Sequence, residues 1–199
     1  MGRCGVTPGE SALELAQQIV KTDRLKFTGL MGYEGHAVMI TDKEERSKVA
    51  NASVDLLVET KELLNKNGID VDIMSGGGTG TYDVSGSRPE MTEVQAGSYV
   101  FMDAKYSTVE GLSEKFNCAL TILTTVISRP KPDMVITDAG MKVMTKEFGI
   151  PQPIDIEGLE QVSLSEEHGK FLAHKETYLK LGDKFELLPT HGCTTINLH

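Results

Sequence analysis

The sequence predicts an α/β protein in which parallel βα units are followed by a mostly antiparallel β domain. In the first part of the chain, short apolar runs alternate with long amphipathic helical stretches, which is the pattern of a parallel sheet with covering helices. After about residue 117, short β-rich segments are separated by Pro and Gly, without a long helical pattern. We therefore expect two domains, at residues 1–115 and 116–199.

Two helices are expected in the first domain. Residues 8–21 begin with Pro and place Leu13, Ala16, Ile19 and Val20 at helical spacing. Residues 43–65 carry a second apolar stripe, and Gly68 lies just beyond its end, where glycine commonly terminates a helix. Short apolar runs predict the strands of this domain at residues 26–31, 71–74 and 93–103.

The second domain is expected to consist of short strands. Their apolar runs lie between Pro and Gly residues at 119–129, 133–140, 160–169 and 183–189. Because parallel βα units bind ligands in the loops after their strands, the polar loops after Met31 and Met74 are the expected sites of chemistry in the first domain.

Composition excludes several classes of protein. The formal charge of −9 and the pI near 5.1, with scattered basic residues, argue against a nucleic-acid surface. No apolar run approaches the roughly 20 residues that span a bilayer. The first residues lack the pattern of a signal peptide, so we expect a soluble, cytoplasmic protein. Three widely spaced cysteines, at 4, 118 and 193, favour reduced thiols or a metal ligand over a disulfide framework.

The run SGGGTGT at residues 75–81 follows an expected strand. Glycine has no Cβ, so successive backbone N–H groups can close around an anion, and Thr adds a hydroxyl donor. The run matches neither the GxGxxG dinucleotide fingerprint nor a P-loop, because no GK[ST] follows. It favours a small phosphorylated ligand over a nucleotide, and the alternative is a flexible turn.

The segment PTHGC at 189–193 places His191 and Cys193 two residues apart. On an extended strand end, side chains at this spacing point to the same side. Imidazole and thiolate together suit Zn²⁺, and two protein ligands leave positions open for water or substrate. The alternative is a loop histidine beside a buried cysteine.

Tyr33 and His36 lie in GYEGH, on the loop after an expected strand, where titratable groups often serve function. They could equally form a hydrogen-bonded pair. His168, in EEHG, has acidic neighbours and could meet the same site from the β domain. His174 and His199 are expected at the surface.

Taken in order, these segments resemble the D-serine dehydratase and D-threonine aldolase family, which shares the alanine-racemase-like fold. Matching stretches cover nearly the whole chain, and their order and spacing carry the resemblance. They are MGRCGV at 1–6, GLMGYEGH at 29–36, SGGGTGTY at 75–82, EVQAGSYVFMD at 93–103, ITDAGMK at 136–142, SEEHG at 165–169 and PTHGC at 189–193.

The resemblance implies that residues 1–115 are the C-terminal part of a (β/α)8 barrel that binds pyridoxal 5′-phosphate (PLP) at its rim, and that residues 116–199 are a truncated β domain. It also implies a homodimer with active sites shared between subunits. It implies that His191 and Cys193 hold Zn²⁺ or another divalent metal, and that Arg3 and Tyr33 lie near the cofactor ring. Many barrel relatives carry arginine where this chain has Gln95, so no ring contact is assigned to Gln95. The residues implied to hold the cofactor phosphate are Gly77, Gly78, Thr79 and Gly80.

The resemblance also implies an activity that needs more than these residues. Family members carry the Schiff-base lysine on a strand upstream of the segment that matches MGRCGV, so we expect no catalytic lysine here and a fragment that is inactive alone. The implied reaction is dehydration or retro-aldol cleavage of D-3-hydroxy amino acids such as D-serine or D-threonine. Alternatives are an amino-acid racemase of the same fold, a non-catalytic PLP-binding protein, or a phosphosugar-binding barrel. Racemisation needs no metal, so the His–Cys pair favours a lyase.

Overall fold

The structure, a computed structural model, describes residues 2–174 and 177–199 and divides into two compact units, residues 1–97 and 98–199. The change of composition near residue 116 therefore lies inside the second unit, and the expected boundary at 115 remains a compositional prediction. No helix in the described ranges has the length and apolar character needed to cross a membrane.

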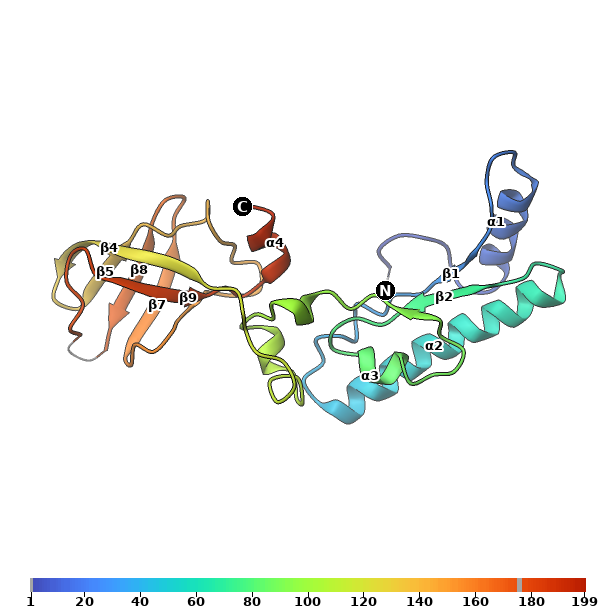
Figure 1. Ribbon diagram of the computed structural model, residues 1–199, viewed down its shortest axis with the longest axis horizontal. Helices are drawn as coiled ribbons and strands as arrows, with labels where there is room; N and C mark the ends of the chain where they lie inside the picture. Colours follow the sequence, from blue (N-terminus) through green and yellow to red (C-terminus); the bar gives the residue numbers. More distant parts are fainter. Residues whose placement is uncertain (1, 175–176) are drawn as a thin grey trace. The chain divides into compact units, whose positions relative to one another are not determined.

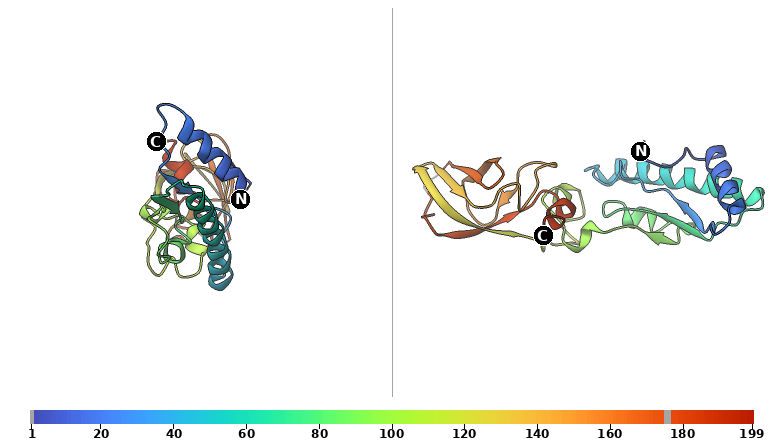
Figure 2. Two further views of the ribbon diagram at one scale, coloured as in Figure 1. Left: turned by 90° about the vertical axis from the view of Figure 1, so that its right-hand side faces the viewer. Right: turned by 90° about the horizontal axis from the view of Figure 1, so that it is seen from above.

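The first unit is built on a three-stranded parallel sheet, β1 (Gly29–Met31), β2 (Ile73–Gly76) and β3 (Glu93–Val94), in that order. Leu30 pairs with Met74, and Ser75 pairs with Glu93. Helix α2 (Lys43–Lys66) runs alongside the sheet, as two views show (Figures 1 and 2), and the other helices of this unit are α1 (Glu10–Lys21) and α3 (Tyr82–Ser85). The expected parallel βα units are confirmed.

Helix α2 follows from its sequence. The Asp42 side chain accepts a hydrogen bond from the N–H of Glu45 (2.8 Å), which caps the first turn, and Gly68 adopts φ +75° just beyond the last. One face is buried, and its Leu57 and Leu64 pack with Met74 of β2 in a single apolar cluster. The predicted range of 43–65 agrees with the observed helix to one residue.

The strand predicted at 93–103 is wrong over most of its length. Only Glu93–Val94 pairs with β2. The N–H of Gln95 then donates to the carbonyl oxygens of Gly76 and Gly77. Residues 98–100 form a 3₁₀ turn, η1 (Ser98–Val100). The run YVFM is apolar without alternation, and Met102 has φ +52°, so the segment cannot continue a flat ladder.

The second unit is a curved six-stranded antiparallel sheet (Figures 1 and 2). Its order is β6-β9-β4-β5-β8-β7, and all five pairings are antiparallel. The predicted antiparallel domain is confirmed, although β6 and β8 were not anticipated. A short 3₁₀ turn, η2 (Tyr106–Thr108), precedes the sheet and a five-residue helix, α4 (Gly192–Ile196), follows it. The strands are β4 (Ile122–Lys131), β5 (Met134–Thr137), β6 (Gln152–Pro153), β7 (Leu159–Leu164), β8 (Gly169–Ala173) and β9 (Lys184–Leu188).

The core of this unit lies on one face of the sheet. Ile122, Thr124 and Val126 of β4 are buried while Leu123 is exposed, so side chains alternate as expected for a half-buried antiparallel strand. Phe171 of β8 meets Phe185 edge to face, with ring centroids 5.5 Å apart. This sheet supports the loops that carry Glu147 and His191.

Candidate functional site

The glycine loop lies between β2 and α3, as expected of a ligand-binding βα loop. Ser75 and Gly76 belong to β2, and every residue from Ser75 to Thr81 is buried. A Cβ at Gly80 would lie 1.9 Å from the carbonyl oxygen of Val38, and one at Gly78 would lie 2.9 Å from the hydroxyl of Tyr33. The glycines are therefore required by close packing on the segment after β1, whatever else they bind.

A buried carboxylate that sequence reasoning passed over holds this loop. Glu34 is 1% exposed and accepts hydrogen bonds from the N–H of Gly77 (3.0 Å) and the hydroxyls of Thr81 and Ser85 (2.6 Å each). The Thr81 oxygen also accepts the N–H of Gly78 (3.0 Å). The only signal in the sequence is an acidic residue between Tyr33 and Gly35, because its hydroxyl partners lie more than 40 positions away.

Two further residues implied by the resemblance lie together in the same unit. The guanidinium carbon of Arg3 lies 5.8 Å from the centre of the Tyr33 ring, within the range of a cation–π contact. Tyr33 thus has Arg3 at its ring and Gly78 at its hydroxyl. Arg3, Tyr33 and the glycine loop therefore lie close together in the first unit. His36, from the same sequence motif, is exposed.

Gln95 also belongs to this locality. Its side-chain Nε2 donates to the hydroxyl of Ser75 (2.6 Å), and its backbone N–H lies 2.8 and 2.9 Å from the carbonyl oxygens of Gly76 and Gly77. These bonds tie β3 to the start of the glycine loop. Gln95 is thus part of the support of the loop.

In the second unit, the HGC segment does not have the extended geometry that its spacing predicted. His191 is extended (φ −145°, ψ 112°), but Cys193 lies in the first turn of α4. Strand alternation therefore does not place the two side chains on the same side. The segment is instead located by Asp103, a buried residue whose Oδ2 accepts the N–H of Gly192 (3.0 Å) and whose Oδ1 accepts that of Tyr106 (2.8 Å).

His191 is fixed by partners that the sequence did not reveal. Its Nδ1 lies 2.6 Å from Oε1 of Glu147, and its ring stacks on Phe148 with centroids 4.3 Å apart. Burial raises the pKa of Glu147, but hydrogen bonds from the hydroxyls of Thr145 and Thr194, its own N–H and His191 outweigh it and lower that pKa to about 2. Glu147 is therefore an ionised acceptor at neutral pH, which leaves Nε2 as the ring nitrogen for another partner.

Few side chains near His191 could serve as metal ligands. Cys193 is an exposed free thiol whose sulfur lies 3.9 Å from the hydroxyl of Ser98. In the described ranges, no cluster of three His, Cys, Asp or Glu side chains is placed to hold a metal ion. An imidazole and a thiolate alone would suit an open site that completes its coordination with water or substrate.

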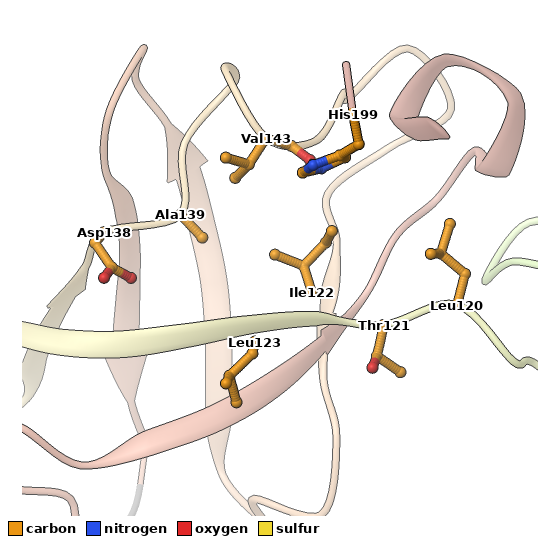
Figure 3. Close-up of a pocket in the computed structure, with 8 residues that line it drawn as sticks. All are labelled: Leu120, Thr121, Ile122, Leu123, Asp138, Ala139, Val143 and His199. Atoms are coloured by element: carbon orange, nitrogen blue, oxygen red, sulfur yellow. The ribbon is translucent and has the colours of Figure 1, made fainter. Parts of the chain in front are cut away.

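A recess of about 430 Å³ lies elsewhere in the second unit. Figure 3 shows Ile122, Val143 and His199 around it, and Nε2 of His199 lies 2.9 Å from the carbonyl oxygen of Val143. None of the predicted site residues lines it, and its one carboxylate, Asp138, already accepts bonds from Thr124 and Thr125. His168 is exposed in the turn between β7 and β8.

Two family models match the chain. Residues 1–105 match the alanine racemase N-terminal domain, and residues 119–199 match the serine dehydratase domain. Among curated proteins, D-threonine aldolase of an Arthrobacter species is 37% identical over the whole chain, and 3-hydroxy-D-aspartate aldolase of Paracoccus denitrificans (strain Pd 1222) is 33% identical. The chain spans about half the length of these relatives, 53% and 52%.

Solved structures agree with these matches. D-threonine aldolase from Filomicrobium marinum superposes over the whole chain and 54% of its own length, with a TM-score of 0.94 at 34% identity. An alanine-racemase-like protein from Idiomarina loihiensis covers the whole chain and 57% of its own, with a TM-score of 0.83 at 26% identity. Alanine racemase of Clostridium difficile shares the fold alone, with a TM-score of 0.62 at 17% identity over 98% of this chain and 52% of its own.

Proposed function

Because the chain belongs to the alanine-racemase-like family of D-serine dehydratases and D-threonine aldolases, we propose that it forms part of a PLP- and metal-dependent lyase acting on D-3-hydroxy amino acids. Its curated relatives include aldolases and a D-threo-3-hydroxyaspartate dehydratase of Delftia sp. (strain HT23), 26% identical. The enzyme class thus follows from the family, whereas the cofactor, the metal and the substrate of this chain are proposals.

The observation that carries the cofactor proposal is the meeting of Arg3, Tyr33 and the glycine loop in one unit. Arg3 brings positive charge to the ring of Tyr33, and the loop supplies backbone donors suited to a phosphate. In the proposed site, Gly77, Gly78, Thr79 and Gly80 surround the phosphate and Tyr33 lies beside the cofactor ring. When bound, PLP supplies an electron sink for charge at the substrate Cα, and the metal supplies a Lewis acid for its β-oxygen.

The metal proposal rests on His191 and its surroundings. Glu147 engages Nδ1, so the imidazole is oriented with Nε2 available, the arrangement in which histidine commonly binds a metal. Cys193, two residues away and exposed, would supply a thiolate. A cysteine variant of D-threo-3-hydroxyaspartate dehydratase, 24% identical, is known in a metal-free form and has the same fold, with a TM-score of 0.84 over 99% of this chain and 58% of its own.

A racemase of the same fold is the principal alternative, because the match over residues 1–105 is shared with alanine racemases. The match of residues 119–199 to a serine dehydratase domain and the identity to aldolases favour the lyase. A non-catalytic PLP-binding protein would not need the oriented His191. We further propose a cytoplasmic homodimer whose active sites take residues from both subunits.

The test is product analysis with the complete protein that contains this chain, reconstituted with PLP and zinc. We expect D-threonine to give glycine and acetaldehyde, or D-serine to give pyruvate and ammonia, and the L-isomers to be inert. Interconversion of D- and L-amino acids without these products would support the racemase. Binding of PLP without any turnover would support the non-catalytic protein.

A further inference from the structure

Glu34 is a buried glutamate whose side chain binds the glycine loop. It lies in the loop after β1, it is 1% exposed, and its carboxylate faces three donors from the glycine loop and α3: Gly77, Thr81 and Ser85. A carboxylate can only accept hydrogen bonds, and burying it without partners would be costly. Three donors satisfy it, so Glu34 and the loop are mutually dependent.

The same hydrogen bonds determine which backbone N–H groups of the loop remain available to a ligand. The N–H of Gly77 points to Glu34, and the N–H of Gly78 points to the Thr81 oxygen, which itself donates to Glu34. Both N–H groups at the start of the loop are thus used inside the protein. The N–H of Gly80 donates to no described residue.

Glu34 also couples the loop to the ring side of the site. The next residue along the chain is Tyr33, whose hydroxyl would lie 2.9 Å from a Cβ at Gly78. The carbonyl oxygen of Glu34 accepts the N–H of Ala37 (2.8 Å), which closes the turn that brings Val38 against Gly80. A single turn therefore sets the positions of Tyr33 and of both ends of the loop.

We propose that Glu34 is the positioning residue of the phosphate loop, and that it consumes the Gly77 and Gly78 N–H groups so that the Gly80 end of the loop faces the phosphate. This inference rests on the proposed function, since it takes the ligand to be PLP. Glu34 acts through the loop and touches no reacting atom.

The experiment compares the affinity of the complete protein for PLP with its affinity for pyridoxal, which lacks the phosphate. Binding is followed by the cofactor's absorbance in the wild type and in Glu34→Ala, Glu34→Gln and Thr81→Val variants. Glutamine can accept the Gly77 N–H through its oxygen and donate to the hydroxyls of Thr81 and Ser85, so it keeps the geometry without the charge. Ser87→Ala, which removes an exposed hydroxyl outside this network, is the matched control.

We expect Glu34→Ala to reduce the preference for PLP over pyridoxal by about tenfold or more, and Glu34→Gln and Ser87→Ala to change it by less than about threefold. Thr81→Val, which separates Gly78 from Glu34 with little change of shape, should reduce the preference even if Glu34→Ala does not fold. Equal weakening of both ligands, or an unchanged preference in Glu34→Ala or Thr81→Val, would overturn the inference. A wild type that binds PLP and pyridoxal equally would overturn the phosphate assignment itself.

Discussion

The two regions with proposed chemistry are built in opposite ways. The glycine loop is buried from Ser75 to Thr81 and is locked from within by the carboxylate of Glu34. In the HGC segment, the His191 side chain is 18% exposed and is oriented by Glu147. The Cys193 side chain is exposed. The difference indicates that the chain itself fixes the proposed phosphate site, whereas the proposed metal site would be completed only when an ion draws its ligands together.

The largest effect is expected when the two regions are taken out of the complete protein. The 199-residue chain spans about half of its curated relatives, so we predict that it has no lyase activity alone, although both regions are present. The measurement is turnover of D-threonine and D-serine by this chain and by the complete protein at equal concentration. Comparable turnover by the two would show that these residues suffice.

The packing of the loop predicts a large effect on stability. Gly80→Ala would place a Cβ 1.9 Å from the carbonyl oxygen of Val38, so we expect a loss of about 3 kcal/mol in the free energy of unfolding. Gly97→Ala is the control, because Gly97 is exposed and has nothing within 4 Å, and it should change stability by less than about 0.5 kcal/mol. Denaturant unfolding measures both. Equal stability of the two variants would mean that the loop is a loose turn.

Substitutions in the proposed metal site around His191 should change the affinity of the protein for a metal ion. We expect His191→Ala to abolish tight Co²⁺ binding and Glu147→Gln to weaken it by about 10- to 100-fold, because the amide no longer orients the imidazole as an ionised acceptor does. The thiolate-to-cobalt absorption band of the complete protein reports both. Exposed Glu160, which contacts His174, provides the control in Glu160→Gln. Unchanged binding in Glu147→Gln would make that contact incidental.

The smallest effect concerns acid stability in the second unit. Burial raises the pKa of Asp138, but bonds from the N–H of Thr125 and the hydroxyl of Thr124 outweigh it and hold the pKa below its usual value. Asp138 therefore stabilises the fold above the pKa of an unfolded aspartate, and this contribution is lost as the pH falls through the depressed value. Asp138 is exposed, so Asp138→Asn should cost no more than about 1 kcal/mol at neutral pH. Unfolding curves of both proteins at several pH values should converge in acid; a constant difference would exclude titration as the cause.

The sequence predicts the elements that have their own periodicity and ends. Helix α2 has an apolar stripe, an Asp42 cap and Gly68 beyond its end, and its range is correct to one residue. Strand β8 has only five residues, GKFLA, and is recognisable mainly by its pairing with β5 and β7. The predicted strand at 93–103 fails because register is set by partners and not by apolar content.

The same distinction applies to the candidate site. Glycine runs and a His–Cys pair are visible as local motifs. Glu34 and Glu147 are not, because Glu34 meets Thr81 and Ser85 across 47 and 51 positions and Glu147 meets His191 across 44. A lone glutamate in a sequence has the same appearance whether it is solvated or buried. Such supporting carboxylates are therefore found only once the fold brings their partners together.

The most direct test of the account is to remove the proposed metal from the complete protein while leaving the cofactor in place. After treatment with a chelator, we expect the PLP absorbance and the thermal unfolding midpoint to be retained, activity on D-threonine and D-serine to be lost, and added zinc to restore it. We expect this result because the proposed cofactor site is formed without the metal, whereas the proposed metal site is completed by the ion. Full activity in metal-free protein would contradict the account and favour a racemase-like reaction that uses PLP alone.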